Sequence, residues 1–283
     1  MNPNLEELLD LTDAVMEHEE ESRGHGVSPD PADGGRQGPF HVGVDLGTAY
    51  TVLMVLDRDY RPVAGSCRFA RIVRDGLVVD FAGAVDLLCA MKRRMEERLG
   101  FELTAAASGY PPGVAREDVR AVENVLYAAG LECTGLIDEP TAANNVLQIR
   151  DGAIVDVGGG TTGVAIFSDG RVVYVADEPT GGTQFTLVIA GSENITFEEA
   201  EALKKDPAQQ RRLFPSVRPV MEKVGSIVGR HIVGHGVECL SLVGGTCAYP
   251  GMGRVIEGYT GVKTFIPANP LFVTPLGIAM HNQ

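Results

Sequence analysis

The sequence predicts an α/β fold built from two similar halves. One unit, an apolar strand followed by a turn with Asp-x-Gly and Thr and then a second strand, occurs at Asp45–Thr48 and again at Asp156–Thr161, 111 residues later. A supersecondary unit that recurs at such a distance indicates a duplicated domain. Strand patterns also alternate with helical patterns along the chain, which is typical of an α/β fold.

The first half begins with two apolar strands that flank the first glycine turn. Two helical stretches follow, and each of them stops at a glycine, Gly100 or Gly130, which is a common end for a helix. The strands are predicted at 40–46 and 51–56, and the helices at 84–99 and 116–129.

The second half repeats the opening strands and then becomes mostly helical. Thr196 can cap a helix there, because Glu199 follows three residues later and completes a capping box. Strands are predicted at 153–157, 162–167, 172–176 and 239–243, and helices at 196–205 and 217–233. We therefore assign residues 40–148, with the C-terminal segment 275–283, to a first lobe, and residues 149–274 to a second lobe.

Residues 1–20 are predicted to hold a short amphipathic helix. Leu5, Leu9 and Met16 recur at helical spacing between acidic residues. Residues 21–39 are rich in glycine and proline and are predicted to be a flexible linker. Two alternatives follow: the helix docks on its own domain or frays, or its apolar stripe binds a groove on a partner protein.

The composition argues against several classes of protein. The formal net charge is -14, so a nucleic-acid partner is not expected, because phosphate binding on that scale needs a basic surface. No apolar stretch approaches the roughly 18 residues of a membrane span, and the acidic N-terminus does not resemble a signal peptide. Five cysteines without a CxxC pair favour a reducing cytosol over a disulfide framework.

The first turn has the residues expected of a phosphate-binding loop. Gly47 allows backbone N–H groups to approach a ligand closely, and Thr48 adds a hydroxyl donor. Asp45, at the strand end, stands where a carboxylate could hold a hydrated Mg²⁺. A single turn of this kind is also typical of an ordinary hairpin.

The second turn favours phosphate binding over an ordinary hairpin, because three successive glycines, Gly158, Gly159 and Gly160, follow its strand. Each glycine costs roughly 0.5–1 kcal/mol relative to alanine in a regular element, so three in a row need a reason. Two such turns that face each other across a cleft could hold phosphates from both sides. Two further segments could contact a nucleoside or be plain turns: Gly181-Gly182-Thr183 and Gly244-Gly245-Thr246.

A pair of histidines, His231 and His235, is the remaining candidate for chemistry. They are four residues apart near a predicted helix end and could share a face and bind a metal. No carboxylate or cysteine completes a clear site by spacing, so a packed or solvated pair is the simpler interpretation.

Four segments, in this order, resemble the nucleotide-binding motifs of the Hsp70 and actin families. Asp45–Tyr50 resembles the first phosphate motif, Glu139–Ala143 the connecting helix, Asp156–Thr162 the second phosphate motif and Leu242–Thr246 the adenosine motif. The resemblance implies an actin/Hsp70-type fold of duplicated ribonuclease H-like domains. It also implies that ATP or ADP binds together with Mg²⁺.

A closer resemblance is to the EutJ family of ethanolamine-utilisation proteins. It is found in Val73–Gly76, Gly109–Gly113, Asp177–Gly182 and Thr274–Ala279. This resemblance implies a chaperone-like protein of the bacterial cytoplasm that acts on ethanolamine-utilisation enzymes or on microcompartment components, and that is associated with or inside a microcompartment. It also makes a cargo tag one form of the partner-binding alternative for residues 1–20.

The Hsp70 resemblance implies a role for each matching residue. Asp45 and Asp156 would hold Mg²⁺ through water, and Glu139 and Thr161 would complete the catalytic set. The cofactor-binding residues would be Gly47, Thr48, Ala49, Tyr50, Gly158, Gly159, Gly160, Thr161, Gly181, Gly182, Thr183, Gly244, Gly245 and Thr246.

The chain departs from the Hsp70 pattern in two ways. The inserted subdomains look reduced or missing, since only 61 residues separate Gly182 from Gly244, so we expect part of the adenine clamp to be lost. Gly163 replaces an aspartate of the second phosphate motif, which implies slow or absent hydrolysis while binding survives. Three functions remain open: an ATP-dependent chaperone-like factor with weak ATPase activity, a non-catalytic adaptor, or a small-molecule kinase of the same fold.

Overall fold

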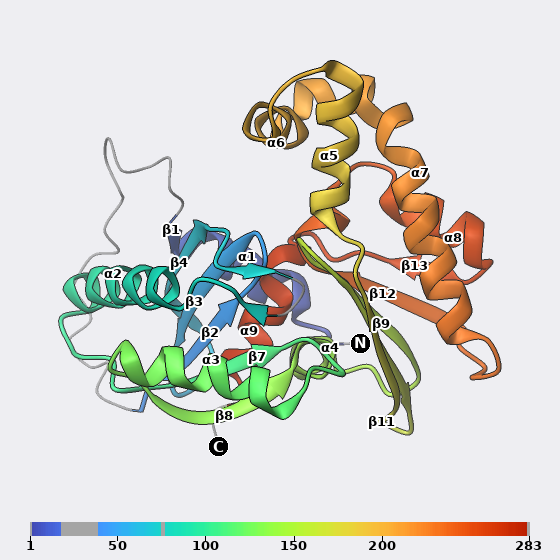
Figure 1. The fold of residues 1–283 in the computed structure, drawn as a ribbon. Helices are drawn as coiled ribbons and strands as arrows, with labels where there is room; N and C mark the ends of the chain where they lie inside the picture. The colour runs from blue at the N-terminus through green and yellow to red at the C-terminus, as the bar shows by residue number, and fades with distance from the viewer. Residues whose placement is uncertain (1, 18–38, 75–76, 282–283) are drawn as a thin grey trace.

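Two β-sheets, one in each half of the chain, organise the structure (Figure 1), a computed structural model that describes residues 2–17, 39–74 and 77–281. The first sheet has the order β1-β4-β3-β2-β7-β8. Its strands are β1 (Met16–Glu17), β2 (His41–Leu46), β3 (Tyr50–Leu56), β4 (Pro62–Phe69), β7 (Ala105–Tyr110) and β8 (Glu132–Asp138). A separate hairpin consists of β5 (Val73–Arg74) and β6 (Leu77–Val78).

The second sheet has the order β11-β10-β9-β12-β13. Its strands are β9 (Gly152–Val157), β10 (Thr162–Ser168), β11 (Arg171–Glu178), β12 (Cys239–Val243) and β13 (Lys263–Phe265). In this sheet β9, β10 and β11 form an antiparallel meander, and β12 and β13 then add in parallel beside β9. The first sheet repeats this plan with β2, β3 and β4 as the meander and β7 and β8 in parallel. The predicted duplication is confirmed, because strand order and strand direction agree in the two sheets.

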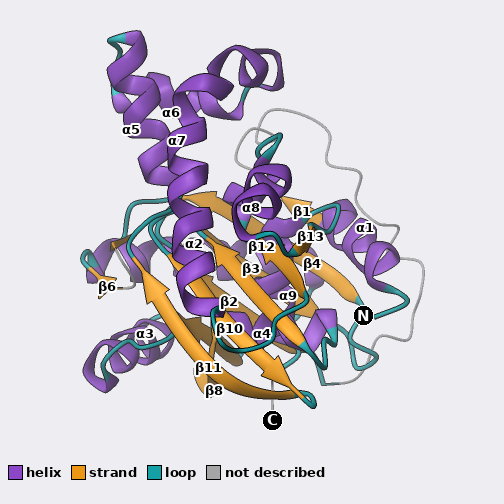
Figure 2. Ribbon diagram, turned by 90° about the vertical axis from the view of Figure 1, so that its right-hand side faces the viewer, coloured by secondary structure: helices purple, strands orange, loops and turns teal. Residues whose placement is uncertain are grey.

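Helices cover both sheets and fill the space between them (Figure 2). They are α1 (Leu5–Val15), α2 (Phe81–Leu99), α3 (Arg116–Ala128), α4 (Glu139–Leu147), α5 (Gly182–Glu193), α6 (Phe197–Lys205), α7 (Pro207–Ile232), α8 (Met252–Thr260) and α9 (Val273–Ala279), with short 3₁₀ turns η2 (Gly245–Ala248) and η3 (Pro270–Phe272). In the described residues, no helix is both long enough and apolar enough to cross a lipid bilayer.

The α4 and α9 helices lie between the two sheets and join the lobes. Val146 of α4 and Leu276 of α9 are buried in one apolar cluster with Met54 of β3 and Ile154 of β9. A Cβ atom at Gly277 would lie 1.8 Å from the carbonyl oxygen of Ala142, so only glycine allows α9 to cross α4 this closely. The C-terminal helix α9 therefore packs against elements of the first lobe, although it comes last in the sequence.

The N-terminal helix α1 is packed against the body of the protein. Leu5, Leu9 and Met16 are buried, and β1 adds a short parallel strand to the edge of β4. Arg98 of α2 also donates a hydrogen bond to the carbonyl oxygen of Val15 at 2.9 Å. The structure thus shows the alternative in which the helix docks on its own domain, and it contradicts a free apolar stripe. The predicted linker 21–39 lies outside the described residues, except for its last position.

The helix predicted at 217–233 begins ten residues earlier, at Pro207. Asp206 caps it by accepting a hydrogen bond from the N–H of Ala208 at 2.9 Å. Pro215 and Pro219 lie inside this helix, although an interior proline costs about 3 kcal/mol. Burial of the apolar face that includes Leu213 outweighs this cost and keeps the helix continuous.

The two inserted subdomains are reduced to different extents. Between β4 and α2, the only strands or helices among the described residues are the antiparallel pair β5 and β6. In the second lobe, α5, α6 and the start of α7 form a helical projection beyond the sheet (Figures 1 and 2). The second insert is therefore present as helices, and α6 has the predicted capping box between Thr196 and Glu199.

Candidate functional site

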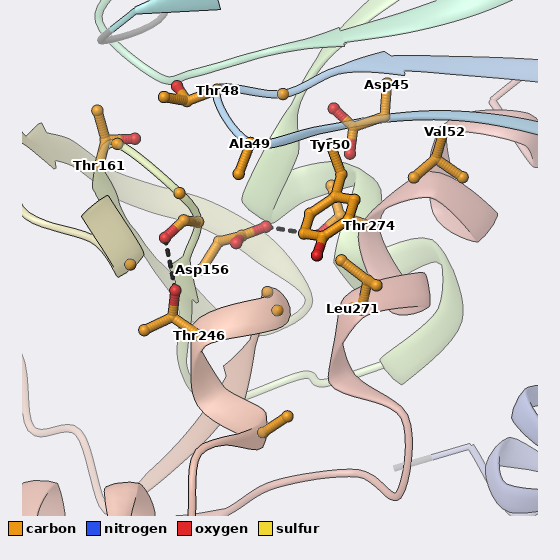
Figure 3. A pocket seen from close by; sticks show the side chains of 18 of the residues that line it. Asp45, Thr48, Ala49, Tyr50, Val52, Asp156, Thr161, Thr246, Leu271 and Thr274 are labelled. Atoms are coloured by element: carbon orange, nitrogen blue, oxygen red, sulfur yellow. Dashed lines mark hydrogen bonds between the residues drawn. The ribbon is translucent and has the colours of Figure 1, made fainter. Parts of the chain in front are cut away.

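The two glycine turns have the same geometry. The N–H of Gly47 donates to the carbonyl oxygen of Tyr50 at 3.0 Å, and the N–H of Gly158 donates to that of Thr161, also at 3.0 Å. An aspartate lies two residues before each of these glycines, at the end of β2 or of β9 (Figure 3). The repeat found in the sequence is thus a repeat of three-dimensional structure.

The two turns touch each other, one from each lobe. A Cβ atom at Gly159 would lie 2.7 Å from the Cβ of Ala49, and one at Gly160 would lie 2.7 Å from the hydroxyl of Thr48. Real Cβ atoms do not approach so closely, so glycines are required where the lobes meet. The sequence-based expectation that the turns face each other is therefore met.

A cavity of about 350 Å³ opens beside this contact and is lined by both lobes. Its size is that of a small-molecule binding site. The predicted residues that line it are Asp45, Gly47, Thr48, Ala49, Tyr50, Glu139, Asp156, Gly158, Gly159, Gly160, Thr161, Gly182, Gly244, Gly245 and Thr246. Gly181 and Thr183 do not line it.

The third and fourth glycine segments support the second turn. The carbonyl oxygen of Gly158 accepts from the N–H of Gly182 at 2.9 Å and from the hydroxyl of Thr246 at 2.8 Å. The N–H of Thr183 donates to the carbonyl oxygen of Gly159 at 2.8 Å. Residues 181–183 and 246 therefore fix the shape of the turn, whether or not they also contact a ligand.

Three acidic side chains gather at the bottom of the cavity. Burial, and then the nearby charge of Asp156, together raise the pKa of Asp45 to about 7. Burial also raises the pKa of Asp156 to about 6, although the hydroxyl of Thr274, which donates to it at 2.5 Å, opposes this shift. The pKa of Glu139 is well above its usual value because of burial and then of repulsion by Asp45 and Asp156.

Such a cluster of carboxylates is unfavourable without a cation. A divalent ion between the acids and bound phosphates would remove the repulsion and favour the ionised forms. In the described part of the chain, no three His, Cys, Asp or Glu side chains are close enough to ligate one metal ion directly. The residues present fit a metal ion that is shared with a phosphate ligand and water.

The chain is similar to ethanolamine utilization proteins over most of its length. It is 43% identical over 248 residues to EutJ of Escherichia coli K12, which covers 87% of each chain. It also matches the crystal structure of EutJ from Carboxydothermus hydrogenoformans at 42% identity and a TM-score of 0.86, over 98% of each chain. This chain belongs to the EutJ family.

More distant similarities place this EutJ family member in the actin/Hsp70-like superfamily. Residues 63–192 match the MreB/Mbl protein family and residues 153–277 match the cell division protein FtsA family. MreB5 of Spiroplasma citri bound to AMPPNP has the same fold, with a TM-score of 0.69, 18% identity, and coverage of 86% of this chain and 96% of that chain. A chaperone protein HscA homologue of Azotobacter vinelandii is 33% identical over 142 residues, which are 46% of this chain and 22% of HscA. The predicted fold class is confirmed.

Two lysines at the end of α6 were missed by sequence reasoning, although they line the cavity of this EutJ protein. The ammonium of Lys204 donates to the carbonyl oxygen of Gly182 at 3.2 Å, to the hydroxyl of Thr186 at 2.9 Å and to the carboxylate of Glu201 at 2.6 Å. The ammonium of Lys205 lies 5.0 Å from the ring centre of Tyr50, in the other lobe. The second insert therefore contributes to the cavity, because α6 supplies Glu201 and both lysines to its wall. The expected loss of part of the adenine clamp stays a prediction.

Gly163 has a carboxylate opposite it. In the ladder between β10 and β11, Gly163 pairs with Asp177, and a Cβ atom at Gly163 would lie 3.5 Å from a carboxylate oxygen of Asp177. The charge of Asp177 contributes to the raised pKa of Glu139. Position 163 itself has no carboxylate, but Asp177 on the adjacent strand places one beside it. No local pattern in the sequence indicates this contact.

The two histidines belong to a structural network rather than to a metal site. His231 lies between the hydroxyl of Tyr174, at 2.7 Å from Nδ1, and the carboxylate of Glu178, at 2.8 Å from Nε2. The ring centre of His235 lies 5.0 Å from that of Tyr174. The packed-pair interpretation agrees with these contacts, which tie the end of α7 to β11.

Proposed function

We propose that this EutJ family member binds ATP or ADP with Mg²⁺ between its lobes and acts as a nucleotide-dependent, chaperone-like protein of ethanolamine utilisation. Its clients would be ethanolamine-utilisation enzymes or components of a microcompartment in the bacterial cytoplasm. The observation that carries the nucleotide part is the convergence of two equivalent glycine turns, one from each lobe, on a single cavity.

Each group of the cavity has a distinct role in this proposal. The turns at Gly47 and Gly158 present backbone N–H groups and the hydroxyls of Thr48 and Thr161 to phosphate oxygens. Lys204 and Lys205 of α6 also line the cavity, with Lys204 beside Gly182 and Lys205 beside Tyr50. Mg²⁺, when bound, would neutralise charge that develops on the phosphates, while Asp45 and Asp156 orient its water ligands.

Glu139 is the candidate to orient an attacking water molecule. Its raised pKa reflects burial and the neighbouring acids, and a bound cation would shift it towards the ionised form that accepts a proton. Phosphoryl transfer depends mainly on positioning and charge stabilisation, so a weak ATPase activity fits this set of residues.

The relatives support the two parts of the proposal separately. Structures of MreB5 from Spiroplasma citri, which shares the fold, are described as bound to AMPPNP and to ADP. The relatives that cover most of the chain are named ethanolamine utilization proteins, and HscA homologues are named chaperones. The fold and the cavity thus support the proposal of nucleotide binding, and family membership supports the proposed role in ethanolamine utilisation.

Contacts between the first lobe and α6 offer a means of closure. The guanidinium of Arg71, which follows β4, lies 4.0 Å from the ring centre of Phe197 and 3.1 Å from the carboxylate of Glu198, both in α6. The ammonium of Lys205 also lies 4.6 Å from the ring centre of Phe69 in β4. We infer that a bound nucleotide favours this closed arrangement and thereby changes a partner-binding surface.

Calorimetry with Mg²⁺ and ATP tests the nucleotide proposal. We expect saturable binding that is weakened by about tenfold or more in Asp156→Asn, because one acid that holds the metal is lost. Asp169→Asn is the matched control, since Asp169 is an exposed acid outside the cavity. Absence of binding by the wild-type chain would leave the non-catalytic adaptor as the better description.

A second cavity favours a small-molecule kinase as the alternative function. It measures about 290 Å³ and shares Thr48, Gly160 and Lys204 with the first cavity, so a second substrate would lie beside the phosphates. A phosphotransfer screen with ethanolamine, acetate and sugars separates the two functions. Rapid turnover of one of these compounds would establish the kinase, and hydrolysis alone would exclude it.

A further inference from the structure

Helix α7 is basic in an acidic protein. Between Pro207 and Ile232 it carries five basic residues, Arg211, Arg212, Arg218, Lys223 and Arg230, and one acidic residue, Glu222. The chain as a whole has a net charge of -14. Positive charge is therefore concentrated on one element, away from the acids of the nucleotide cavity.

A groove lies between this helix and α8, which runs alongside it (Figure 1). Its volume is about 680 Å³, and its apolar lining includes Phe214 of α7 and Val255 and Tyr259 of α8. The side chain of Tyr259 remains 54% exposed although it lies against Gly225. The groove is thus an apolar surface that nothing in the described residues covers.

Arginines line the groove beside this apolar surface, and two of them have no ion pair among the described residues. Arg218 forms an ion pair with Glu222 at 2.8 Å. Arg211 and Arg254 form no ion pair in the part of the chain that the structure describes. Arginine and tyrosine are enriched among the residues that contribute most to protein interfaces, because they combine apolar contact with strong hydrogen bonds.

We propose that the groove between α7 and α8 is a docking site for an acidic, partly apolar segment of a partner protein. Apolar side chains of the segment would pack on Phe214, Val255 and Tyr259, and its carboxylates would pair with Arg211 and Arg254. A concave apolar floor between cations suits a peptide or helix that inserts side chains. An anionic membrane would instead favour apolar residues that protrude from a basic surface.

Site-specific photocrosslinking tests this docking site in the full-length protein. Tyr259→p-benzoylphenylalanine is expressed in cells of the source bacterium, and irradiated adducts are mapped by mass spectrometry. We expect an adduct with a segment of another protein in which Asp and Glu outnumber Lys and Arg. The matched control carries the same probe at exposed Tyr127 of α3 and is expected to give no such adduct.

A charge-reversal arm checks the role of the arginines. Combining Arg211→Glu and Arg254→Glu with the probe should lower the adduct yield by about tenfold or more, because two favourable charge pairs become repulsive. Arg58→Glu with Arg150→Glu, two exposed arginines elsewhere, should leave it unchanged. All variants should keep the wild-type melting temperature.

Several outcomes overturn the proposal. These are the absence of any adduct, an adduct with lipid, nucleic acid or a second copy of the chain, and an adduct with a segment that is not acidic. An equal loss of adduct in the two charge-reversal variants also overturns it. None of these outcomes depends on nucleotide binding. The experiment therefore tests the docking site independently of the proposed function.

Discussion

At the scale of single residues, the acids of the cavity are arranged for a ligand rather than for stability. Burial raises the pKa of Asp45, Glu139 and Asp156, and none has a basic partner among the causes of its shift. The charge of Asp156 raises the pKa of Asp45 and Glu139 further. Groups that are strained in the empty protein and relieved by a ligand are typical of binding sites. The repulsion between these acids destabilises the empty protein, and a bound cation would remove it.

Asp45→Asn should therefore stabilise the empty protein. The pKa of Asp45 is about 7 in the folded protein and 3.8 in a model compound. Between pH 3.8 and pH 7, this side chain therefore binds fewer protons in the unfolded chain than in the folded protein. Stability from this group is present at low pH and is lost as the pH rises through about 7. We expect Asp45→Asn to gain about 1–3 kcal/mol near pH 8 without metal, and less near pH 5.

Urea unfolding at the two pH values measures this effect. Asp169→Asn, an exposed acid that is 90% accessible at its side chain, is the control and should change stability little. A loss of stability in Asp45→Asn near pH 8 would contradict the proposed repulsion.

The position of Asp177 leads to a second prediction at the scale of single residues. Since its carboxylate faces Gly163 and adds to the charge around Glu139, we expect it to help position the reacting groups. Asp177→Asn should slow single-turnover hydrolysis of bound ATP by about tenfold or more while changing the dissociation constant much less. Quenched-flow kinetics and calorimetry on the same sample distinguish these effects. Equal losses in binding and hydrolysis would instead indicate a structural role.

At the scale of elements, helices α1 and α6 both make contacts with the walls of the cavity that the sequence did not predict. The α6 helix brings Lys204 to the carbonyl oxygen of Gly182, so the insert is tied directly to the second phosphate turn. The α1 helix lies against the edge of the first sheet, and Asp13 accepts a hydrogen bond at 2.9 Å from Asn269, a residue that also lines the cavity. The N-terminal helix is thus linked to the wall of the site.

Two leucines of α1 test whether the helix is part of the folded core. Leu9 is 1% exposed, whereas Leu11 on the same helix is 38% exposed. Leu9→Ala should destabilise the protein by about 2–4 kcal/mol, because it removes buried apolar atoms and leaves a cavity. Leu11→Ala, the matched control, should cost much less. Denaturant unfolding gives both values, and equal small effects would indicate a helix that does not dock.

At the scale of the whole molecule, the lobes are joined at one side of the cavity and only touch at the other. Buried packing of α4 and α9 joins them permanently, while α6 reaches the first lobe through surface contacts made by Arg71 and Lys205. Exposed ion pairs and cation–π contacts are each worth about 1 kcal/mol or less. The weak side is therefore where we expect the lobes to separate.

Arg71→Ala should consequently speed release of nucleotide. Loss of its contacts with Phe197 and Glu198 removes a connection between the first lobe and α6, and we expect the dissociation rate to rise about threefold to tenfold. Stopped-flow displacement of a fluorescent ADP analogue measures the rate. Arg58→Ala, at an exposed arginine elsewhere, is the control. An unchanged rate in Arg71→Ala would show that closure does not depend on this contact.

The sequence by itself determined the features that are encoded locally. The glycines at 47 and 158–160, the aspartates before them and the capping box at Thr196 specify turns and helix starts from their own residues and near neighbours. The repetition of the first turn 111 residues later then fixed the duplicated fold.

Only the tertiary structure decided which distant residues meet. Lys204 beside Gly182, Asp177 opposite Gly163, and the burial of α1 against the body all result from packing between elements whose separation in sequence carries no signal of contact. The early start of α7, despite two interior prolines, has the same origin, because the apolar core outweighs local helix propensity. Turn chemistry is a property of a few adjacent residues, whereas the walls of a cavity depend on how whole elements pack.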